Sequence, residues 1–184
     1  MQQKNYYIIT GGPGVGKTTL LNELGKRGFT IIPEEARRII QEQVATNGEG
    51  LPWGNKELYA RLMLEESRQS YQRVETDLSA SKPVFFDRGI VDAVCYMIME
   101  DIPVTKKINK WVRTSSYNSR VFMLPPWREI YQTDKERKQT WAEAVRTYEA
   151  MKDVYTSYGY HVTDIPKGTV ANRADFILEQ IRKV

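Results

Sequence analysis

Cysteine and histidine are nearly absent from this 184-residue chain, which has one of each. A single cysteine, Cys95, cannot form an internal disulfide, which agrees with a reducing compartment. Cys95 lies in an apolar stretch, and we expect it to be buried rather than reactive. His161 has no cysteine or second histidine near it in the sequence, so we expect it to be structural or on the surface, with no zinc site.

Long apolar runs are also missing. No run approaches the roughly 20 residues that a membrane-spanning helix needs. Residues Met1–Asn5 lead directly into a strand-like run rather than into the apolar region of a signal peptide. We therefore expect a cytoplasmic protein that does not use a membrane.

The overall composition is that of a soluble globular protein, with 41% apolar and 27% charged residues. We find no internal repeat, low-complexity segment or linker. A chain of this length can bury one complete hydrophobic core. We therefore expect residues 1–184 to form a single nucleotide-binding domain, as a monomer or a homodimer.

The positive charge is concentrated in one segment. The chain has a net charge of +4, and residues Lys106 to Arg146 contain ten basic and four acidic residues. This segment could close over a phosphate group, contact nucleic acid or simply face solvent. Its aromatic residues do not alternate with basic ones in a stacking pattern, so we do not expect a nucleic-acid partner.

The most specific motif follows the apolar run Tyr6-Tyr7-Ile8-Ile9 and fits the phosphate-loop pattern G-x-x-x-x-G-K-[ST]. Glycines let the backbone turn its N–H groups toward a phosphate, and the helix that follows adds the positive end of its dipole. This predicts binding of ATP or GTP with Mg²⁺. The loop residues are Gly11, Gly12, Pro13, Gly14, Val15, Gly16, Lys17 and Thr18.

Three side chains at the end of this loop have separate expected roles. We expect Lys17 to reach the β- and γ-phosphates and the Thr18 hydroxyl to bind Mg²⁺. Thr19 could lie near the α-phosphate or line the helix.

Short apolar runs alternate with longer periodic segments along the whole chain, which predicts an α/β fold with a five-stranded parallel sheet. Helices on both faces would give the three-layer fold of P-loop NTPases. We expect strands at Tyr6–Thr10, Phe29–Ile32, Val84–Asp87, Val121–Leu124 and Tyr160–Ile165. We expect helices at Lys17–Lys26, Glu34–Ala45, Lys56–Leu78, Ile90–Met99, Lys106–Thr114, Asp134–Tyr158 and Val170–Arg182.

Ligands of open parallel sheets bind beyond the carboxyl ends of the strands. The second expected strand is followed by Glu34 and Glu35. Acidic residues there can simply complement the helix dipole. Alternatively, one of them orients or deprotonates an acceptor hydroxyl; Glu34 is nearer the strand and is our choice, while Glu35 stays open.

The third expected strand ends in Phe85-Phe86-Asp87-Arg88. An apolar run closing on an aspartate has the form of the Walker B element, so we expect Asp87 to hold Mg²⁺. Arg88 could contact the acceptor or a phosphate, or pair with Glu34 or Glu35.

Two further segments could complete the site. Residues at about 126–140 are rich in charge, and we expect them to form a helical lid in which Arg128 and Arg137 close over the transferred phosphoryl group. In the loop after the last strand, Lys167 and Gly168 could contact the nucleotide base.

The chain resembles the small AAA-domain P-loop family related to bacterial ribosylnicotinamide kinases. The segments that carry the resemblance are the phosphate loop, Pro33–Arg38, Phe86-Asp87-Arg88-Gly89, Tyr131–Trp141 and Ile165–Arg173. That family is similar to deoxynucleoside and nucleoside-monophosphate kinases. The resemblance implies an ATP and Mg²⁺ site, with Glu34 as the acid on the acceptor side, Asp87-Arg88 as the acid-arginine pair and Arg137 in a lid. One departure argues against a ring-forming motor, because Arg88 stands where such motors carry a second acidic residue.

These observations predict a phosphotransferase that moves the γ-phosphoryl group of ATP to a small nucleoside-like or other small-molecule acceptor. The alternative is a nucleotide-gated module of the ATPase or GTPase type that hydrolyses slowly and has no small-molecule acceptor. The sequence does not identify the acceptor.

Overall fold

The computed structural model describes residues 5–77, 82–131 and 140–182. Its centre is a parallel sheet in the order β2-β3-β1-β4-β5, so the expected five-stranded parallel sheet is confirmed. The first strand lies in the middle, and its carboxyl end therefore meets the ends of both neighbouring strands. The strands are β1 (Tyr6–Gly11), β2 (Thr30–Ile32), β3 (Val84–Asp87), β4 (Arg120–Leu124) and β5 (His161–Asp164).

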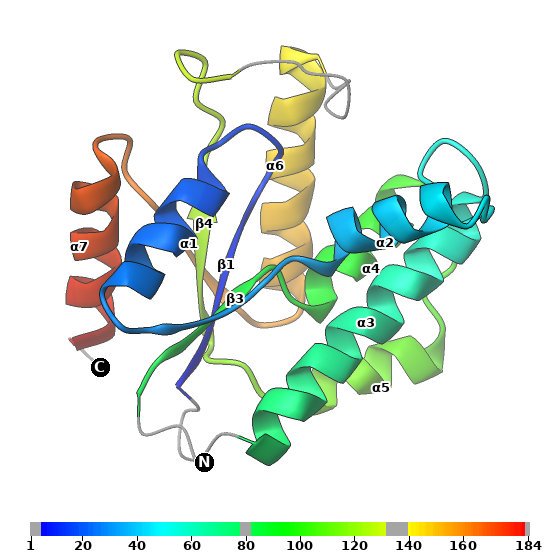
Figure 1. Cartoon of the computed structure of the whole chain (residues 1–184), viewed down its shortest axis with the longest axis horizontal. Coiled ribbons are helices and arrows are strands. Elements are labelled where there is room, and N and C mark those ends of the chain that lie inside the picture. Colours follow the sequence, from blue (N-terminus) through cyan, green and yellow to red (C-terminus); the bar gives the residue numbers. More distant parts are fainter. Residues whose placement is uncertain (1–4, 78–81, 132–139, 183–184) are drawn as a thin grey trace.

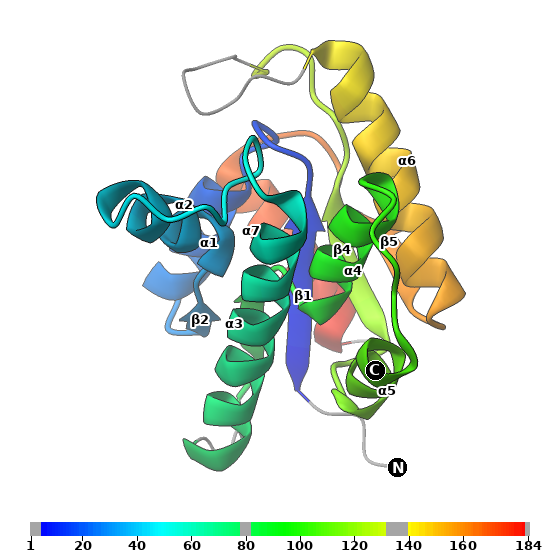
Figure 2. The same ribbon diagram turned by 90° about the vertical axis from the view of Figure 1, so that its right-hand side faces the viewer.

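Helices cover both faces of the sheet, which gives the three expected layers (Figures 1 and 2). Helices α1 and α7 pack together on one face, while α4 and α6 pack together on the other and α3 lies against α4. The bounds are α1 (Lys17–Lys26), α2 (Glu35–Ala45), α3 (Lys56–Asp77), α4 (Ile90–Met99), α5 (Lys106–Thr114), α6 (Trp141–Ser157) and α7 (Val170–Arg182).

The strands alternate their side chains between two cores. Tyr7 and Ile9 of β1 belong to the core under α1 and α7, whereas Ile8 belongs to the core under α4 and α6. Side chains of a strand point alternately to the two faces, and a central parallel strand buries both. The buried Cys95 lies in the α4 core, as expected from the sequence.

The long helix begins later than the sequence predicts. We expected a helix from Asp134, but Thr140 has an extended backbone and caps α6, which begins at Trp141. The Thr140 hydroxyl accepts a hydrogen bond from the Glu143 amide (3.3 Å), and the Glu143 carboxylate accepts one from the Thr140 amide (2.6 Å). This capping box is a strong start for a helix. Residues 134–139 lie outside the described residues.

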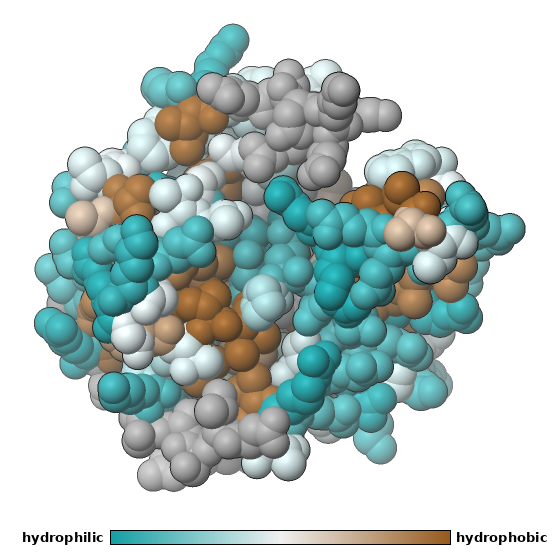
Figure 3. Space-filling model, viewed as in Figure 1, coloured by the Kyte–Doolittle hydropathy of each residue, from teal (hydrophilic) through white to brown (hydrophobic). Residues whose placement is uncertain are grey.

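The surface is mostly hydrophilic over α2 and α3, and an apolar strip shows between α1 and α3 (Figure 3). Edge strand β2 lies in this region, and its Ile31 and Ile32 are partly exposed. Within the described residues, no helix combines the length and apolar character needed to cross a bilayer.

We predict that Gly11→Ala destabilises the fold more than Gly159→Ala. Both glycines have positive φ angles, 149° and 86°. A Cβ atom at Gly11 would lie 2.8 Å from the Leu124 carbonyl oxygen, whereas at Gly159 it would meet nothing within 4 Å. Strained backbone alone costs about 1–3 kcal/mol. Urea unfolding of both variants measures the difference, and equal losses of stability would contradict the close β1–β4 contact.

Candidate active site

The phosphate loop connects the end of β1 to the start of α1. Gly14 and Gly16 have φ angles of 75° and 80°, a conformation that glycine adopts without strain. Gly16 is the N-cap residue of α1, so the free N–H groups of the first helical turn face the loop. The loop therefore has the backbone of an anion-binding site.

A cavity of about 740 Å³ opens over this loop, and we call it the loop cleft. Residues 12–19, which are the loop without Gly11 together with Thr19, form one wall. Gly168 and Thr169, from the segment between β5 and α7, form another with Arg173, and Trp127 and Ile130 also line the cleft. Its volume is typical of a site for a ligand of nucleotide size.

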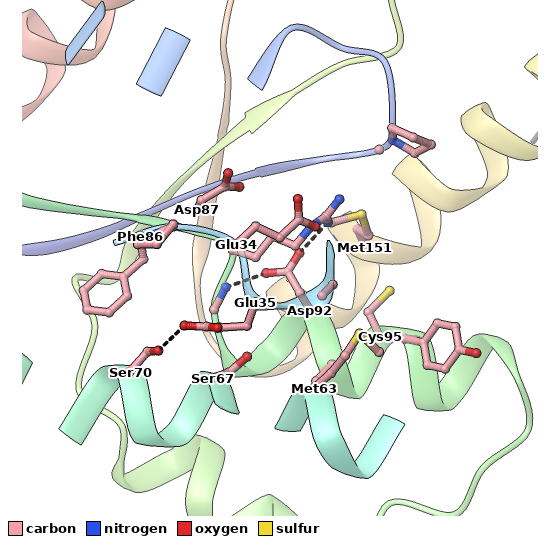
Figure 4. A pocket seen from close by; sticks show the side chains of 18 of the residues that line it. Glu34, Glu35, Met63, Ser67, Ser70, Phe86, Asp87, Asp92, Cys95 and Met151 are labelled. Carbon is pink, nitrogen blue, oxygen red and sulfur yellow. Dashed lines mark hydrogen bonds and ion pairs between the residues drawn. The ribbon is translucent and has the colours of Figure 1, made fainter. Parts of the chain in front are cut away.

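A second cavity of about 240 Å³ lies between α3 and α4, and we call it the α3–α4 pocket. Apolar and sulfur-containing side chains form much of its lining, among them Met63, Cys95 and Met151 (Figure 4). The two cavities meet, because both are lined by Gly12, Pro13, Glu34, Ala36, Tyr59 and Arg88.

Four charged side chains join the strand ends at this junction. Lys17 Nζ lies 2.5 Å from Asp87 Oδ1 and 3.5 Å from Glu34 Oε2. Arg88 Nε donates to Glu34 Oε1 at 2.6 Å. The structure thus brings together four of the residues chosen from the sequence: Lys17, Glu34, Asp87 and Arg88.

The two carboxylates of this cluster differ in their electrostatics. Burial alone would raise the pKa of Glu34, but the positive charges of Arg88 and Lys17 outweigh it and lower the pKa to about 2. For Asp87, burial has the larger effect and raises the pKa, although Lys17 offsets part of it. Glu34 is therefore held firmly as an anion.

Glu35 faces away from this cluster. Its carboxylate accepts a hydrogen bond from the Ser70 hydroxyl on α3 (2.8 Å) and one from Arg38 Nε (2.7 Å), as Figure 4 shows for Ser70. Both acids line the α3–α4 pocket, but only Glu34 also lines the loop cleft.

Arg88 is held in an uncommon conformation. Its φ angle is 71°, in the left-handed region that costs a non-glycine residue energy. Its amide donates to the Ile9 carbonyl (3.0 Å), and its side chain bonds Glu34 and Asp92. Hydrogen bonds from both its backbone amide and its guanidinium group therefore hold Arg88 at the end of β3.

Asp92 is a site residue that the sequence reasoning missed. Its carboxylate accepts hydrogen bonds from Arg88, the Gly89 amide, Thr10 and Tyr155. It therefore ties the ends of β1 and β3 to α4 and α6. An acid in the first turn of an apolar helix was the available signal, but that pattern is also typical of simple capping.

The remaining predicted residues are more scattered. Arg128 is exposed and lies over the Trp141 ring, 5.8 Å from its centroid, and it lines neither cavity. Lys167 is exposed and also lines neither, although Gly168 lines the loop cleft. Arg137 and most of the expected lid fall in residues 132–139, outside the described residues.

The residues expected to hold Mg²⁺ offer a suitable donor set. Thr18 lines the loop cleft with its hydroxyl at the start of α1, and Asp87 provides a carboxylate at the end of β3. Oxygen ligands of this kind suit Mg²⁺, which takes few protein ligands and completes its shell with water and phosphate. One Asp87 oxygen is paired with Lys17, so Lys17 and the ion would share this carboxylate.

Solved structures of small-molecule kinases resemble this fold. A deoxyadenosine kinase from M. mycoides is 15% identical with a TM-score of 0.67, and the match covers 97% of this chain and 100% of that chain. A thymidylate kinase from Ehrlichia chaffeensis is 15% identical, with a TM-score of 0.62 and coverages of 96% and 97%.

A NadR protein in complex with NR is 18% identical with a TM-score of 0.72, and the match covers 98% of this chain and 51% of that chain. The present chain thus spans about half of that protein. No curated protein sequence is significantly similar to the chain. Residues 6–173 match the AAA domain family, which confirms the resemblance seen in the sequence. The chain is therefore a member of this family, with the P-loop fold of nucleotide kinases.

Proposed function

We propose that the protein is a kinase that transfers the γ-phosphoryl group of ATP to a hydroxyl group of a small acceptor. The observation that supports it is the junction of the two cavities. A nucleotide on the phosphate loop would direct its terminal phosphate toward Glu34 and Arg88, which also line the α3–α4 pocket. A hydrolase needs only the first cavity, whereas a transferase needs both.

Positioning and charge would supply most of the catalysis, as in other phosphoryl transfers. Glu34 accepts a hydrogen bond from the acceptor hydroxyl and takes its proton as the bond from oxygen to the γ-phosphorus forms. The bond from that phosphorus to the bridging oxygen breaks, and ADP leaves. Bound Mg²⁺ would neutralise charge on the β- and γ-phosphates, and Lys17 and Arg88 add positive charge from the protein.

The charges around the α3–α4 pocket favour an acceptor that carries no phosphate group. Five carboxylates line this pocket, whereas Arg88 is the only cation that lines it among the described residues. Arg88 is already bonded to Glu34 and Asp92. A dianionic phosphate would meet these carboxylates without a free partner. The apolar part of the lining suits an uncharged part of the acceptor. The carboxylates are Glu34, Glu35, Asp87, Asp92 and Glu100.

We predict acceptor-dependent release of ADP with a phosphate-free acceptor. The assay compares matched pairs, each a nucleoside and its 5′-monophosphate, in the presence of ATP and Mg²⁺. We expect turnover with at least one nucleoside and less with its monophosphate. A slow hydrolysis that no acceptor accelerates would favour the nucleotide-gated module instead. Faster turnover with the monophosphate would contradict the preference for a phosphate-free acceptor and would leave the kinase proposal standing.

We predict that Lys17→Met weakens ATP binding by about tenfold to hundredfold, the loss expected for a hydrogen bond to a charged group. The control is Lys26→Met, at the exposed far end of the same helix. Calorimetric titration with Mg²⁺–ATP measures both. An unchanged ATP affinity in a folded Lys17→Met variant would contradict the assignment of this loop to the ATP phosphates.

We predict that Glu34→Gln lowers kcat by about 10²–10⁴-fold, the usual range for loss of a general base, with little change in the KM for ATP. Glu35→Gln should have a smaller effect, because Glu35 bonds Arg38 and Ser70. A larger loss in the Glu35 variant would reverse the assignment.

The pH dependence of the reaction gives a second test of the role of Glu34. A lowered pKa means that Glu34 is ionised at every pH well above about 2. The profile of kcat/KM for ATP reports the enzyme before the nucleotide binds. We therefore expect no acidic limb from Glu34 near neutral pH. An acidic limb near neutral pH that disappears in Glu34→Gln would contradict the lowered pKa that Arg88 and Lys17 give Glu34.

A further inference from the structure

Arg173 lies at the loop cleft but has no part in the function described so far. It belongs to α7, which packs beside α1 (Figure 1), and its side chain is only 5% exposed. Its Nη1 atom lies 3.5 Å from the Val15 carbonyl oxygen. A Cβ atom added to Gly16 would lie 3.0 Å from the same nitrogen. The guanidinium group is thus in contact with the phosphate loop.

The charge of Arg173 has no counter-ion among the described residues. None of their carboxylates forms an ion pair with it, and its buried Nε has no hydrogen-bond acceptor. Burial lowers its pKa, and no anion within the described part of the chain opposes this. Lys17 and Arg88 differ, because each touches two carboxylates. Burying an uncompensated charge is costly.

The surroundings of Arg173 indicate what would compensate the charge. Its side chain lines the loop cleft together with Gly16, Thr18 and Thr19. The face of the guanidinium packs over Trp127, 5.6 Å from the ring centroid, and this contact limits its movement. Its donors therefore stay near the place where the N–H groups of the loop bind an anion.

We infer that Arg173 is a nucleotide-binding residue whose guanidinium group is the counter-charge for the phosphate chain of the bound triphosphate. The inference rests on the nucleotide half of the proposed function and needs no acceptor. The energy lost by burying the cation in the free protein is recovered when the phosphates arrive. Arg173 thus ties α7 to the occupancy of the phosphate loop.

The test compares Arg173→Met, which removes the charge at similar size, with Arg173→Lys, which keeps it. Arg182→Met is the control, because Arg182 is an exposed arginine on the same helix. Calorimetric titration with Mg²⁺–ATP and thermal unfolding of the free protein are measured for each. We expect Arg173→Met to lose about tenfold to hundredfold in ATP affinity. Its free form should unfold at the same temperature as wild type or higher, since an unpaired buried charge is gone. Arg173→Lys should recover part of the affinity.

Two results would overturn the inference. One is an unchanged ATP affinity in folded Arg173→Met, while wild type binds ATP. The other is a lower unfolding temperature of free Arg173→Met together with an equal loss of affinity in Arg173→Lys, because shape rather than charge would then be responsible. A kinase assay that fails with every acceptor leaves both measurements intact. A wild-type protein that binds no ATP would instead contradict the proposed function and this inference together.

Discussion

The structure depends on a compact set of alternating charges where three strands end. Lys17 lies between Asp87 and Glu34, and Glu34 lies between Lys17 and Arg88. Each charge is partly buried, so each needs its neighbour to offset the loss of water. This requirement fixes the phosphate loop relative to β2 and β3. Without Lys17, the carboxylates of Glu34 and Asp87 would lie at the same sheet edge with no lysine between them.

The cluster also explains why an arginine occupies a left-handed backbone position. The conformation of Arg88 costs about 1–3 kcal/mol, and such strain persists only where the surroundings over-determine it. Its backbone bonds β1, and its side chain bonds Glu34 and Asp92. Asp92 is itself bonded to Thr10 and Tyr155, which places a buried acid beneath the arginine. The strained backbone position is the one that places the Arg88 side chain at the junction of the two cavities.

The sequence was sufficient for the fold and for the residues at the strand ends, because these follow from local pattern. Alternating apolar runs predict strands, and residues that follow parallel strands must share one edge. Asp92 and Arg173 lie within helices, and only the packing of α4 and α7 brings them to the site. Thr140 was missed as a helix start because charged residues before it favour helix as well. The Arg128 side chain packs over the Trp141 ring, and the spacing of residues in the sequence does not reveal this contact.

The position of Lys17 links the two halves of the site. In this structure its amine is paired with Asp87 and near Glu34, whereas the phosphate loop directs a lysine toward the β- and γ-phosphates. If the amine moves to the phosphates, Glu34 loses one of the two cations that lower its pKa. That loss alone would raise the pKa of Glu34. Donor binding would thereby make Glu34 a better base for the acceptor, at the moment when a phosphoryl group is in place to be transferred.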